Sequence, residues 1–392
     1  MKKRFIITLI SLIAGMFFIS GCGTDIKRSQ HPEIRDGVLD LRNWDLDRDG
    51  TIDLSGSWQI YWKQLLSGKD FDSQTAPQMT DLYKVPATWN GFEVNGEKLT
   101  GEGYATFVLE VRVQSTDTPL AFKIQDMDTA YNLYVDHQLV ASNGVVGISR
   151  ETMVPEFKPL TADFSITGDK FRVILQVSNF YHTRGGPWSK IQLGSAKNIK
   201  AKAESNLLTN GFLIGSIFIM GLYHLFLFTL RRKESSYLYF GVFCSLIALR
   251  SLLVSERYLH IFFPGLNWEF LQKVEYLSFY AAVPIFAMFI SSLFPNEFKT
   301  PFLRLIQGIS SLFILLVVFS HPRIFTATVN VYQIFTIVSG IYVFYVLFSA
   351  YREKRAGIMI LLGGYLFLFI TIINEILYVN ALIQTGYTSS LG

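Results

Sequence analysis

The sequence predicts a multidomain protein, an all-β sandwich followed by an all-α polytopic bundle of transmembrane helices, and two observations predict it. Up to about residue 200, short runs of β-branched and aromatic residues alternate with polar ones and are separated by Gly, Pro, Asn and Asp, which is typical of many strands joined by turns. From about Leu207 onward the chain is a succession of long apolar runs, each near the roughly 20 residues that a helix needs to cross a bilayer.

The N-terminus has the parts of an export signal. Residues 2–4 are basic, residues 5–19 are apolar, and small residues lead up to Cys22, a pattern typical of a bacterial lipoprotein signal peptide with lipidation of Cys22. The alternative is an uncleaved first membrane helix, although the run is short for a span. The expected segments are a signal peptide and lipobox at 1–22, a linker at 23–37, the extracytoplasmic sandwich at 38–200 and the helical domain at 201–392.

Composition narrows the class of protein. The chain has only two cysteines, Cys22 and Cys244, so a lipidated Cys22 would leave the exported domain without an internal disulfide and dependent on its core. A formal net charge of +4 is small for 392 residues and predicts no nucleic-acid partner. Hydrophobic residues make up 50% of the chain, which is high for a soluble protein.

The stretch FVLEVRV, residues 107–113, shows the strand pattern clearly. Its odd-numbered residues are apolar, whereas Glu110 and Arg112 belong to the opposite face. Asp136 and His137 stand between two further runs, where a tight hairpin turn belongs. Since no helix of several turns is indicated in this half, two antiparallel sheets packed face to face are the economical architecture.

An acidic stretch, DLDRDGTIDLSG at residues 45–56, has two interpretations. Its aspartates and Gly50 match the early positions of a calcium loop, but the twelfth position, which needs a bidentate Glu, is Gly56. The alternative is turn chemistry, in which short acidic side chains accept hydrogen bonds from nearby amides. No other cofactor is expected, and calcium would be held by Asp45, Asp47, Asp49 and Asp53.

Five blocks between about residues 38 and 200 resemble one known ectodomain. They are LSGSWQIYWKQLL, VPATWN, GEGYATFVLEV, AYNLYVDHQLVASNGVVG and VSNFYHTRGGPWSKIQLG. Together they resemble the galactose-binding-like jelly-roll ectodomain of bacterial seven-transmembrane receptors with diverse intracellular signalling modules. The resemblance implies a jelly-roll sandwich that binds a small molecule, with carbohydrate as one ligand class. It also favours turn chemistry for the acidic stretch, which precedes the first strand in the family.

Aromatic and polar residues in this domain are candidates for contacts with such a ligand. An aromatic face matches the apolar face of a sugar ring, and loops on a rigid sandwich are where binding surfaces arise. The alternative for each aromatic residue is core packing, which we expect for Trp58. The candidates for ligand binding are Trp89, Tyr104, Asn179, His182, Arg184 and Trp188.

Six apolar segments of spanning length follow the sandwich. With the sandwich outside, the first helix runs inward, and the basic residues at 231–233 and 352–355, together with Lys299 and Arg304, then fall on the cytoplasmic side. The spans are expected at 207–230, 237–254, 270–294, 302–320, 326–350 and 357–379.

The helical region also resembles the membrane region of the same receptor family. The resemblance rests on GLYHLFLFTLRRKESSYLYFGVFCSLIALRSLL and on NEILY in the sixth span. The family has a seventh helix and a cytoplasmic output module beyond this point. We therefore expect the 392 residues to be a fragment or an incomplete member of the family.

Ionisable or strongly polar residues occur inside the apolar segments. Such residues usually face the bundle interior or a watery cavity. Arg250 and Glu275 lie toward the outer ends of neighbouring spans and are placed for an ion pair, with snorkelling to the interface as the alternative. The intramembrane polar residues are His224, Arg250, Glu275, Asn374 and Glu375.

These observations favour a multi-pass receptor of the bacterial cell membrane, with its N-terminal domain extracytoplasmic. We expect membrane lipid and an extracytoplasmic small-molecule or carbohydrate ligand as partners, and a homodimer from signalling logic. The alternatives are a lipid-anchored carbohydrate-binding adhesin and a transporter with a substrate-capturing lectin domain, which broken helices or inverted repeats would indicate. No carboxylate pair, metal-ligand spacing or nucleophile motif points to an enzyme.

Overall fold

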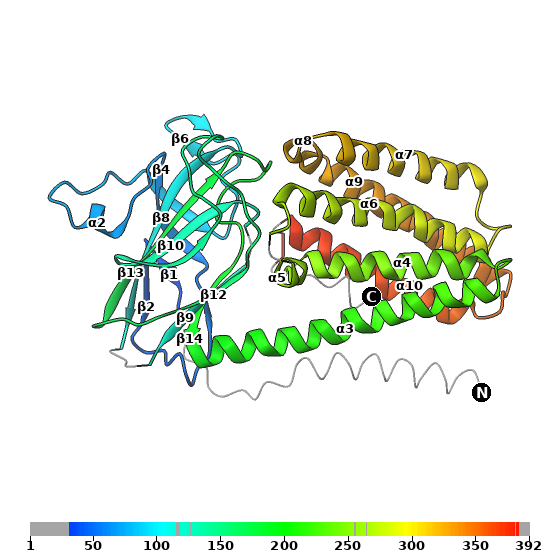
Figure 1. Cartoon of the computed structure of the whole chain (residues 1–392), viewed down its shortest axis with the longest axis horizontal. Coiled ribbons are helices and arrows are strands. Elements are labelled where there is room, and N and C mark those ends of the chain that lie inside the picture. The colour runs from blue at the N-terminus through cyan, green and yellow to red at the C-terminus, as the bar shows by residue number, and fades with distance from the viewer. Residues whose placement is uncertain are drawn as a thin grey trace. The chain divides into compact units, whose positions relative to one another are not determined.

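A computed structural model describes residues 31–114, 118–125, 127–254, 256–263, 265–380 and 382–383. The chain separates into two compact units, Met1–Glu33 and Ile34–Gly392, and every named helix and strand of the described residues lies in the second unit. This unit contains a domain of strands followed by a domain of helices (Figure 1), which confirms the predicted fold class. The predicted lipidation site, Cys22, lies outside the described residues.

Two sheets form the N-terminal sandwich. The larger, eight-stranded sheet has the order β11-β10-β13-β8-β2-β1-β4-β5, and the four-stranded sheet has the order β12-β9-β14-β3. Most neighbours are antiparallel, but β2 pairs with β8 and β1 with β4 in parallel. The large sheet consists of β1 (Ile34–Arg35), β2 (Val38–Leu41), β4 (Gly56–Trp62), β5 (Asp81–Val85), β8 (Gly103–Val113), β10 (Ala130–Val135), β11 (Gln138–Asn143) and β13 (Lys170–Asn179). The small sheet consists of β3 (Ile52–Asp53), β9 (Leu120–Ile124), β12 (Leu160–Phe164) and β14 (Ile191–Ser195), while β6 (Glu93–Val94) and β7 (Glu97–Lys98) form a separate hairpin and α2 (Gly68–Phe71) is a single turn.

The hydrophobic core lies between the two sheets. Phe107, Leu109 and Val111 of β8 are buried there with apolar side chains of β9 and β12, which confirms the alternation predicted for this strand. Trp58 of β4 is fully buried in the same cluster, and its indole Nε1 donates a hydrogen bond to Leu54 O at 3.0 Å. The core position expected of Trp58 is therefore confirmed.

Asp136 and His137 form the predicted turn between β10 and β11. Asp136 has a φ of 50°, in the left-handed region that Asp adopts more readily than most residues. Its carboxylate accepts a hydrogen bond from the backbone N–H of Arg172 at 2.8 Å. The turn is thus tied to the neighbouring strand β13.

Six helices of the described residues are long and apolar enough to cross a membrane, as predicted. Apart from the start of the first helix, their ends differ from the predicted spans by only a few residues. The six are α3 (Ala196–Leu230), α4 (Ser235–Leu253), α6 (Trp268–Leu293), α7 (Thr300–Phe319), α9 (Val329–Arg352) and α10 (Ile358–Val379), and the short helices α5 (Tyr258–Phe262) and α8 (Pro322–Ala327) lie in the connections.

The first helix begins earlier than predicted. α3 starts at Ala196, directly after β14 ends at Ser195 (Figure 1). The hydroxyl of Ser195 caps the helix by accepting a hydrogen bond from Asn198 N at 3.3 Å. The sequence analysis placed the span at residue 207 because residues 196–206 are too polar for a membrane, but their Ala, Lys and Glu residues are good helix formers. The strand and the helix are therefore joined without a flexible linker.

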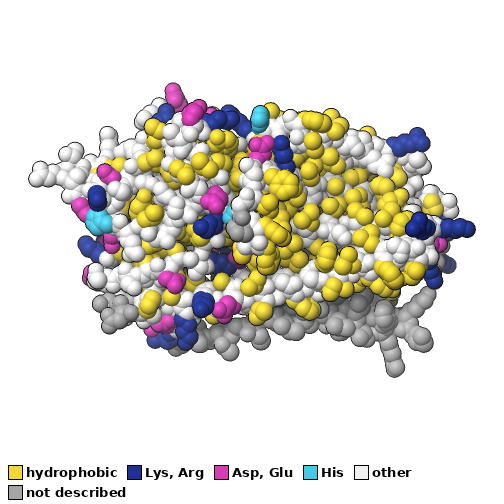
Figure 2. Space-filling view, viewed as in Figure 1, with side chains coloured by type: hydrophobic (Ala, Val, Ile, Leu, Met, Phe, Trp, Pro, Cys, Tyr) yellow, Lys and Arg dark blue, Asp and Glu magenta, His cyan; other side chains and the backbone are white. Residues whose placement is uncertain are grey.

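The outer faces of the helices are apolar. Phe212, Ile219 and Phe319 are 75%, 67% and 83% exposed, and Figure 2 shows hydrophobic side chains covering the helical domain on the face in view. A surface of this kind suits contact with lipid chains. With the six apolar helices, it identifies a multi-pass membrane protein.

Helices α3 and α4 approach each other closely at Gly221 and Gly241. A Cβ atom on Gly221 would lie 3.1 Å from Gly241 O, and one on Gly241 would lie 3.0 Å from Gly221 O. Small residues permit such close approach between membrane helices. The position of the first helix along the second therefore depends on this pair.

Replacing Trp58 by alanine should destabilise the sandwich by about 3–5 kcal/mol, because a fully buried indole and its hydrogen bond to Leu54 O are lost. The measurement is thermal unfolding of the full chain in lipid nanodiscs. Leu139→Ala is the control, because Leu139 is 50% exposed and should tolerate truncation. Equal melting temperatures for the two variants would contradict the core position of Trp58.

Candidate functional site

A cavity of about 150 Å³ lies where the loops of the sandwich meet the ends of the membrane helices. The sandwich contributes Asp128, His182, Arg184 and Trp188 to its wall. The rest of the wall comes mainly from α4, α6, α9 and α10, with Thr326 of α8. The cavity therefore belongs to both domains.

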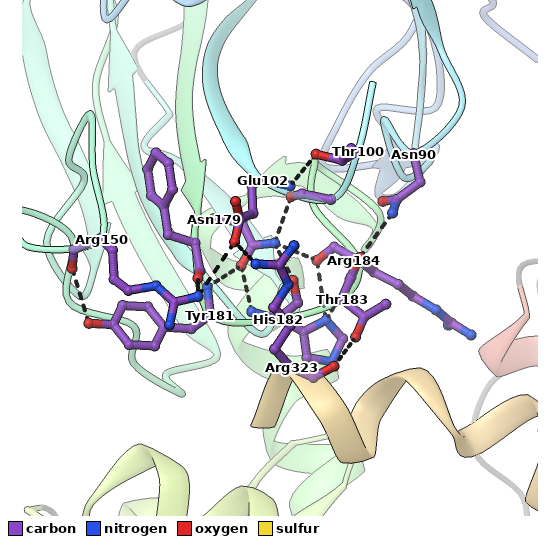
Figure 3. Close-up of polar contacts among 12 residues, drawn as sticks. Asn90, Thr100, Glu102, Arg150, Asn179, Tyr181, His182, Thr183, Arg184 and Arg323 are labelled. Carbon is purple, nitrogen blue, oxygen red and sulfur yellow. Dashed lines mark hydrogen bonds and ion pairs between the residues drawn. The ribbon is translucent and has the colours of Figure 1, made fainter. Parts of the chain in front are cut away.

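Asn179, at the end of β13, shapes the loop that carries three of these side chains. Its Nδ2 donates to Gly101 O at 2.8 Å and to His182 O at 2.7 Å, and its Oδ1 accepts from His182 N at 2.9 Å. Figure 3 shows Asn179 beside His182 and Arg184 within this network. Because Asn179 is fully buried and its amide is engaged by the backbone, it positions the loop.

The same loop is fastened to the helices through Thr183. Its hydroxyl donates to Arg323 O at 3.0 Å and lies 2.6 Å from Thr326 Oγ1. Arg323 also forms an ion pair with Glu102 of the sandwich, which lies 3.4 Å from Arg150 Nη2. These contacts hold the N-terminal end of α8 against the sandwich (Figure 3).

Arg184 connects the loop to the end of α10. Its Nη1 donates to Val379 O at 2.6 Å, and its Nη2 donates to Asn380 Oδ1 at 3.2 Å and Asn330 Oδ1 at 3.3 Å. Figure 3 shows its side chain extending away from the other loop residues. Cations are favourable at a helix C-terminus, where carbonyl oxygens lack intrahelical partners.

Arg257 forms a second bridge between the domains. Its guanidinium lies 2.5 Å from the Asp128 carboxylate of the sandwich and 2.8 Å from Glu275 of α6, and it donates to Leu253 O at 2.9 Å. It also stacks 3.7 Å from the ring centroid of Phe157. The Arg257 side chain is only 8% exposed, so its charge is neutralised by buried partners from both domains.

A third bridge involves the first helix. Lys123 Nζ of β9 lies 2.5 Å from Glu256 Oε1, which also accepts a hydrogen bond from Asn206 Nδ2 of α3 at 3.0 Å. In the first turn of α3, Asn198 Nδ2 donates to Leu46 O of the sandwich at 2.9 Å. The first turns of α3 are thus held to the sandwich along their polar face.

The intramembrane charges pair differently from the predicted pair of Arg250 with Glu275. Arg250 Nη2 forms an ion pair with Glu375 of α10 at 2.8 Å, while Glu275 pairs with Arg257. Arg250 Nη1 lies 3.4 Å from the backbone oxygen of Glu275. The charged residues were predicted from the sequence, but no local pattern in it indicates that α10 supplies the partner of Arg250.

The structure brings together some of the predicted site residues and separates others. Among the ligand-binding candidates, His182, Arg184 and Trp188 line the cavity, and among the intramembrane residues Arg250, Glu275 and Glu375 line it. His224 lies in α3 against Phe240, away from the cavity, and Asn374 is not part of its wall.

The other candidates belong to the body of the sandwich. Trp89 has no exposed surface, donates to Gly101 O at 3.0 Å and packs 5.1 Å from the ring of Trp62, which leaves no ring face for stacking on a sugar. Tyr104 is half-buried on β8 opposite Ser178 of β13. Asp128 is a cavity residue that the sequence analysis did not select, because no motif marks it.

The acidic stretch adopts a turn. Asp45 Oδ1 accepts from Asp47 N at 2.9 Å, and Asp49 Oδ2 accepts from Asp45 N at 2.9 Å. Asp53 lies on β3, 2.5 Å from Gln192 Nε2 and 3.4 Å from Lys190 Nζ. These hydrogen bonds from backbone amides to Asp45 and Asp49 are the turn chemistry that the sequence analysis considered.

His182 is buried, and desolvation lowers the pKa of its imidazole below the usual value. The nearby Asp128 carboxylate acts in the opposite direction and is the smaller effect. The Nδ1 of His182 lies 3.0 Å from Arg184 N and 3.2 Å from Arg184 O, so the Arg184 backbone contacts the ring in either neutral tautomer. His182 is therefore a neutral member of the cavity wall at pH 7.

Replacing Arg257 by glutamine should cost about 3–5 kcal/mol, because Asp128 and Glu275 would lose the charge that neutralises them while still buried. Thermal unfolding of the full chain measures the effect. Arg112→Gln is the control, because Arg112 is 44% exposed and pairs with Glu110 on the surface, where ion pairs contribute little.

Adding Asp128→Asn and Glu275→Gln to the Arg257→Gln variant should restore part of the lost stability, because the unpaired charges are then removed. If Arg257→Gln lowered the stability no more than Arg112→Gln, Arg257 would not be the group that neutralises Asp128 and Glu275.

Acidification should destabilise the chain through His182. The pKa of His182 in the folded state is lowered, whereas the unfolded value is about 6.5, so the unfolded state binds the proton first. This contribution to stability is complete above the unfolded pKa and is lost as the pH falls below it. We expect His182→Gln to show a smaller drop in melting temperature between about pH 7.5 and about pH 5.5.

His321→Gln is the matched control for the pH experiment, because His321 is exposed before α8 and its loss removes no buried imidazole. A wild-type pH dependence retained by His182→Gln would argue against this role of His182.

Comparison with known proteins finds a family model that matches the helical half of the chain. Residues 206–392 match the family model described as 7TM diverse intracellular signalling. No curated protein matches the chain. Solved structures that it resembles include a β-glucuronidase from Faecalibacterium prausnitzii, with a TM-score of 0.29 and 11% identity over 38% of this chain and 31% of the enzyme.

Two further structures are similar at the same level. A GH2 β-galacturonidase from Eisenbergiella tayi has a TM-score of 0.26 and 14% identity over 37% of this chain and 24% of the enzyme. A Ruminococcus gnavus β-glucuronidase has a TM-score of 0.29 and 12% identity over 37% of this chain and 28% of the enzyme. The chain spans less than a third of the length of these enzymes.

Two independent observations identify the helical region as a membrane region. They are its six membrane-capable helices among the described residues and the family match that covers the chain from residue 206 onward. The match confirms the resemblance that the sequence analysis found for the helical region. Residues 206–392 are thus a multi-pass membrane region similar to that of the 7TM diverse intracellular signalling family.

Proposed function

We propose that the chain is a receptor whose extracytoplasmic sandwich and helix bundle bind one small molecule between them and transmit its presence across the membrane. The family match supports a membrane sensor. The observation that carries the finer proposal is the shared cavity, whose wall comes from sandwich loops and from four membrane helices. A ligand in this cavity contacts both domains at once.

Charge supports the orientation. α3 leaves the sandwich at Ala196 and ends just before the basic residues 231–233, and α9 ends just before the basic residues 354–355. Both clusters therefore follow helix ends remote from the sandwich, and loops rich in Lys and Arg stay in the cytoplasm. The proposal accordingly places the sandwich outside a bacterial cell membrane, with Cys22 as a lipid anchor.

The coupling route runs through α3. Strand β14 continues into the helix at Ser195, and the helix is held to the sandwich at Asn198 and, through Glu256, at Asn206. A displacement of the small sheet must therefore move the outer end of α3. A helix transmits such a displacement along its axis because its backbone hydrogen bonds keep it stiff.

A ligand signals only if it binds one arrangement of the domains better than another. Arg184 is suited to this task, because its partners on the helices are neutral carbonyl oxygens and not carboxylates. Exchanging these contacts for contacts with a ligand would cost little electrostatic energy. The loop could thus leave or approach the end of α10 as the cavity fills or empties.

The resemblance of the ectodomain implies carbohydrate as a ligand class, and a receptor of this kind needs no catalytic step of its own. The shared cavity favours a receptor over an adhesin, because helices that only anchor a lectin have no need to line its site. It is also lined mostly by the sandwich-facing halves of the helices, so no route across the membrane is implied.

The proposal predicts that the sandwich loop and the cytoplasmic ends of the helices are coupled through α3. Arg184→Ala removes the contacts of the loop with α10 and should change hydrogen–deuterium exchange at residues 231–234, which follow the far end of α3. In a chain with Gly-Ser-Gly-Ser inserted after Lys200, the same substitution should leave that exchange unchanged.

The same insertion after Gln74, an exposed loop position, is the control and should preserve the response to Arg184→Ala. Exchange at residues 231–234 that does not respond to Arg184→Ala in the uninterrupted chain would overturn the coupling route.

A further inference from the structure

The cavity changes in character from its sandwich end to its membrane end. On α6, Glu275 and Tyr276 lie near the sandwich, and Ala282, Phe286 and Ala287 lie further along the helix. At 1.5 Å per residue, the distance along the helix from the first of these to the last is about 18 Å. The wall is therefore polar at one end and mainly apolar at the other.

The wall residues of α4 and α10 also change from charged near the sandwich to aromatic further along each helix. On α4, Arg250 lies at the sandwich end and Phe243 deeper, and on α10 Glu375 lies at the sandwich end and Tyr365 and Phe369 deeper. A purely polar ligand would leave this aromatic wall without apolar contact. The deep end matches a hydrocarbon group, whose transfer from water is favourable.

The volume limits the size of that group. At about 150 Å³, the cavity matches an engineered apolar cavity that admits benzene. A six-carbon tail is of this size, whereas a complete phospholipid is far larger. The volume thus limits the apolar part of a ligand to about this size.

Charges around the polar end are balanced. The carboxylates of Asp128, Glu275 and Glu375 are matched by the guanidinium groups of Arg184, Arg250 and Arg257, and most of these groups are joined in the ion pairs described above. His182 adds no charge. A charged head group would bring an unmatched charge into a site of low dielectric, which is costly.

Two buried polar atoms of the wall have no hydrogen-bond partner within the described part of the chain. They are Trp188 Nε1, which can only donate, and Glu375 Oε2, which accepts. Glu375 is 7% exposed, and its other oxygen is bound by Arg250. A head group with several hydroxyls, each of which both accepts and donates hydrogen bonds, could satisfy both atoms.

We infer that the cavity binds an uncharged amphiphile, with a hydroxyl-bearing head group at Trp188 and Glu375 and an apolar tail of about six carbons among Phe243, Phe286 and Phe369. The inference rests on the proposed receptor function and names the chemical class of its ligand. A sugar head group meets the requirement when it carries such a tail.

The test uses the full chain in phosphatidylcholine nanodiscs and four probes: hexyl glucoside, hexanoate, hexylammonium and glucose. Titration calorimetry should show saturable binding of hexyl glucoside, at least about tenfold tighter than that of the other three. Equal binding of glucose would overturn the need for a tail. Tighter binding of either charged probe would overturn the uncharged head group.

Variants of the wall separate the cavity from the bilayer. Ala282→Leu narrows the apolar end and should weaken hexyl glucoside binding at least about tenfold, whereas Ala281→Leu, at the adjacent position outside the wall, should not. Phe286→Ala should shift the preference from hexyl to octyl glucoside, and Phe270→Ala, at a 52% exposed position, should leave it unchanged. Equal affinities for Ala282→Leu and Ala281→Leu would place the probe in the lipid and overturn the inference.

Exchange at residues 231–234 distinguishes this inference from the proposed function. Binding of hexyl glucoside in the cavity without any change in exchange supports the amphiphile site and counts against the receptor. A response of that exchange to Arg184→Ala, with no probe bound by the cavity, retains the receptor and overturns the ligand class.

Discussion

The buried guanidinium of Arg257 is the interaction on which the meeting of the two domains depends. It contacts Asp128 and Phe157 of the sandwich, Glu275 of α6 and the last turn of α4. A charge this deeply buried is tolerated only while its partners stay in place. If the sandwich separated from the helices at Arg257, buried charges would be left unpaired. Asp128 and Glu275, which line the cavity, are therefore held in place.

Arg184 and Thr183 fasten the sandwich loop to the helices by contacts of another kind. Their partners on the helices are neutral oxygens, so breaking these hydrogen bonds leaves no partner charge unpaired. The interface thus has a strong point at Arg257 and an exchangeable point at Arg184. In the proposed receptor, a ligand in the cavity would exchange contacts at Arg184 and leave the buried ion pairs of Arg257 in place.

Local patterns explain what could be predicted from the sequence. The alternation at residues 107–113 and the apolar runs of spanning length are properties of neighbouring residues, and the structure has both. The pairing of Arg257 with Asp128, 129 positions away, is not a local property, and no motif records it.

Trp89 shows a related limit, because a tryptophan in a turn-rich segment can fold back into the core. The early start of α3 was missed because span length was inferred from hydropathy, and hydropathy does not register a polar helix.

The packing of α3 bears on how a signal could leave the sandwich. Only 6% of its apolar window is buried within the protein, against 17–33% for the other five membrane-capable helices of the described residues. Apart from its close contact with α4 at Gly221 and Gly241, α3 therefore has few buried side chains to repack during a displacement, and dense packing is what resists small shifts. Its N-terminal end, by contrast, follows a strand directly and is bonded to the sandwich. Firm attachment at one end and light packing along the length are what a helix needs to transmit movement, while the more deeply buried α6 and α9 keep the cavity wall in place.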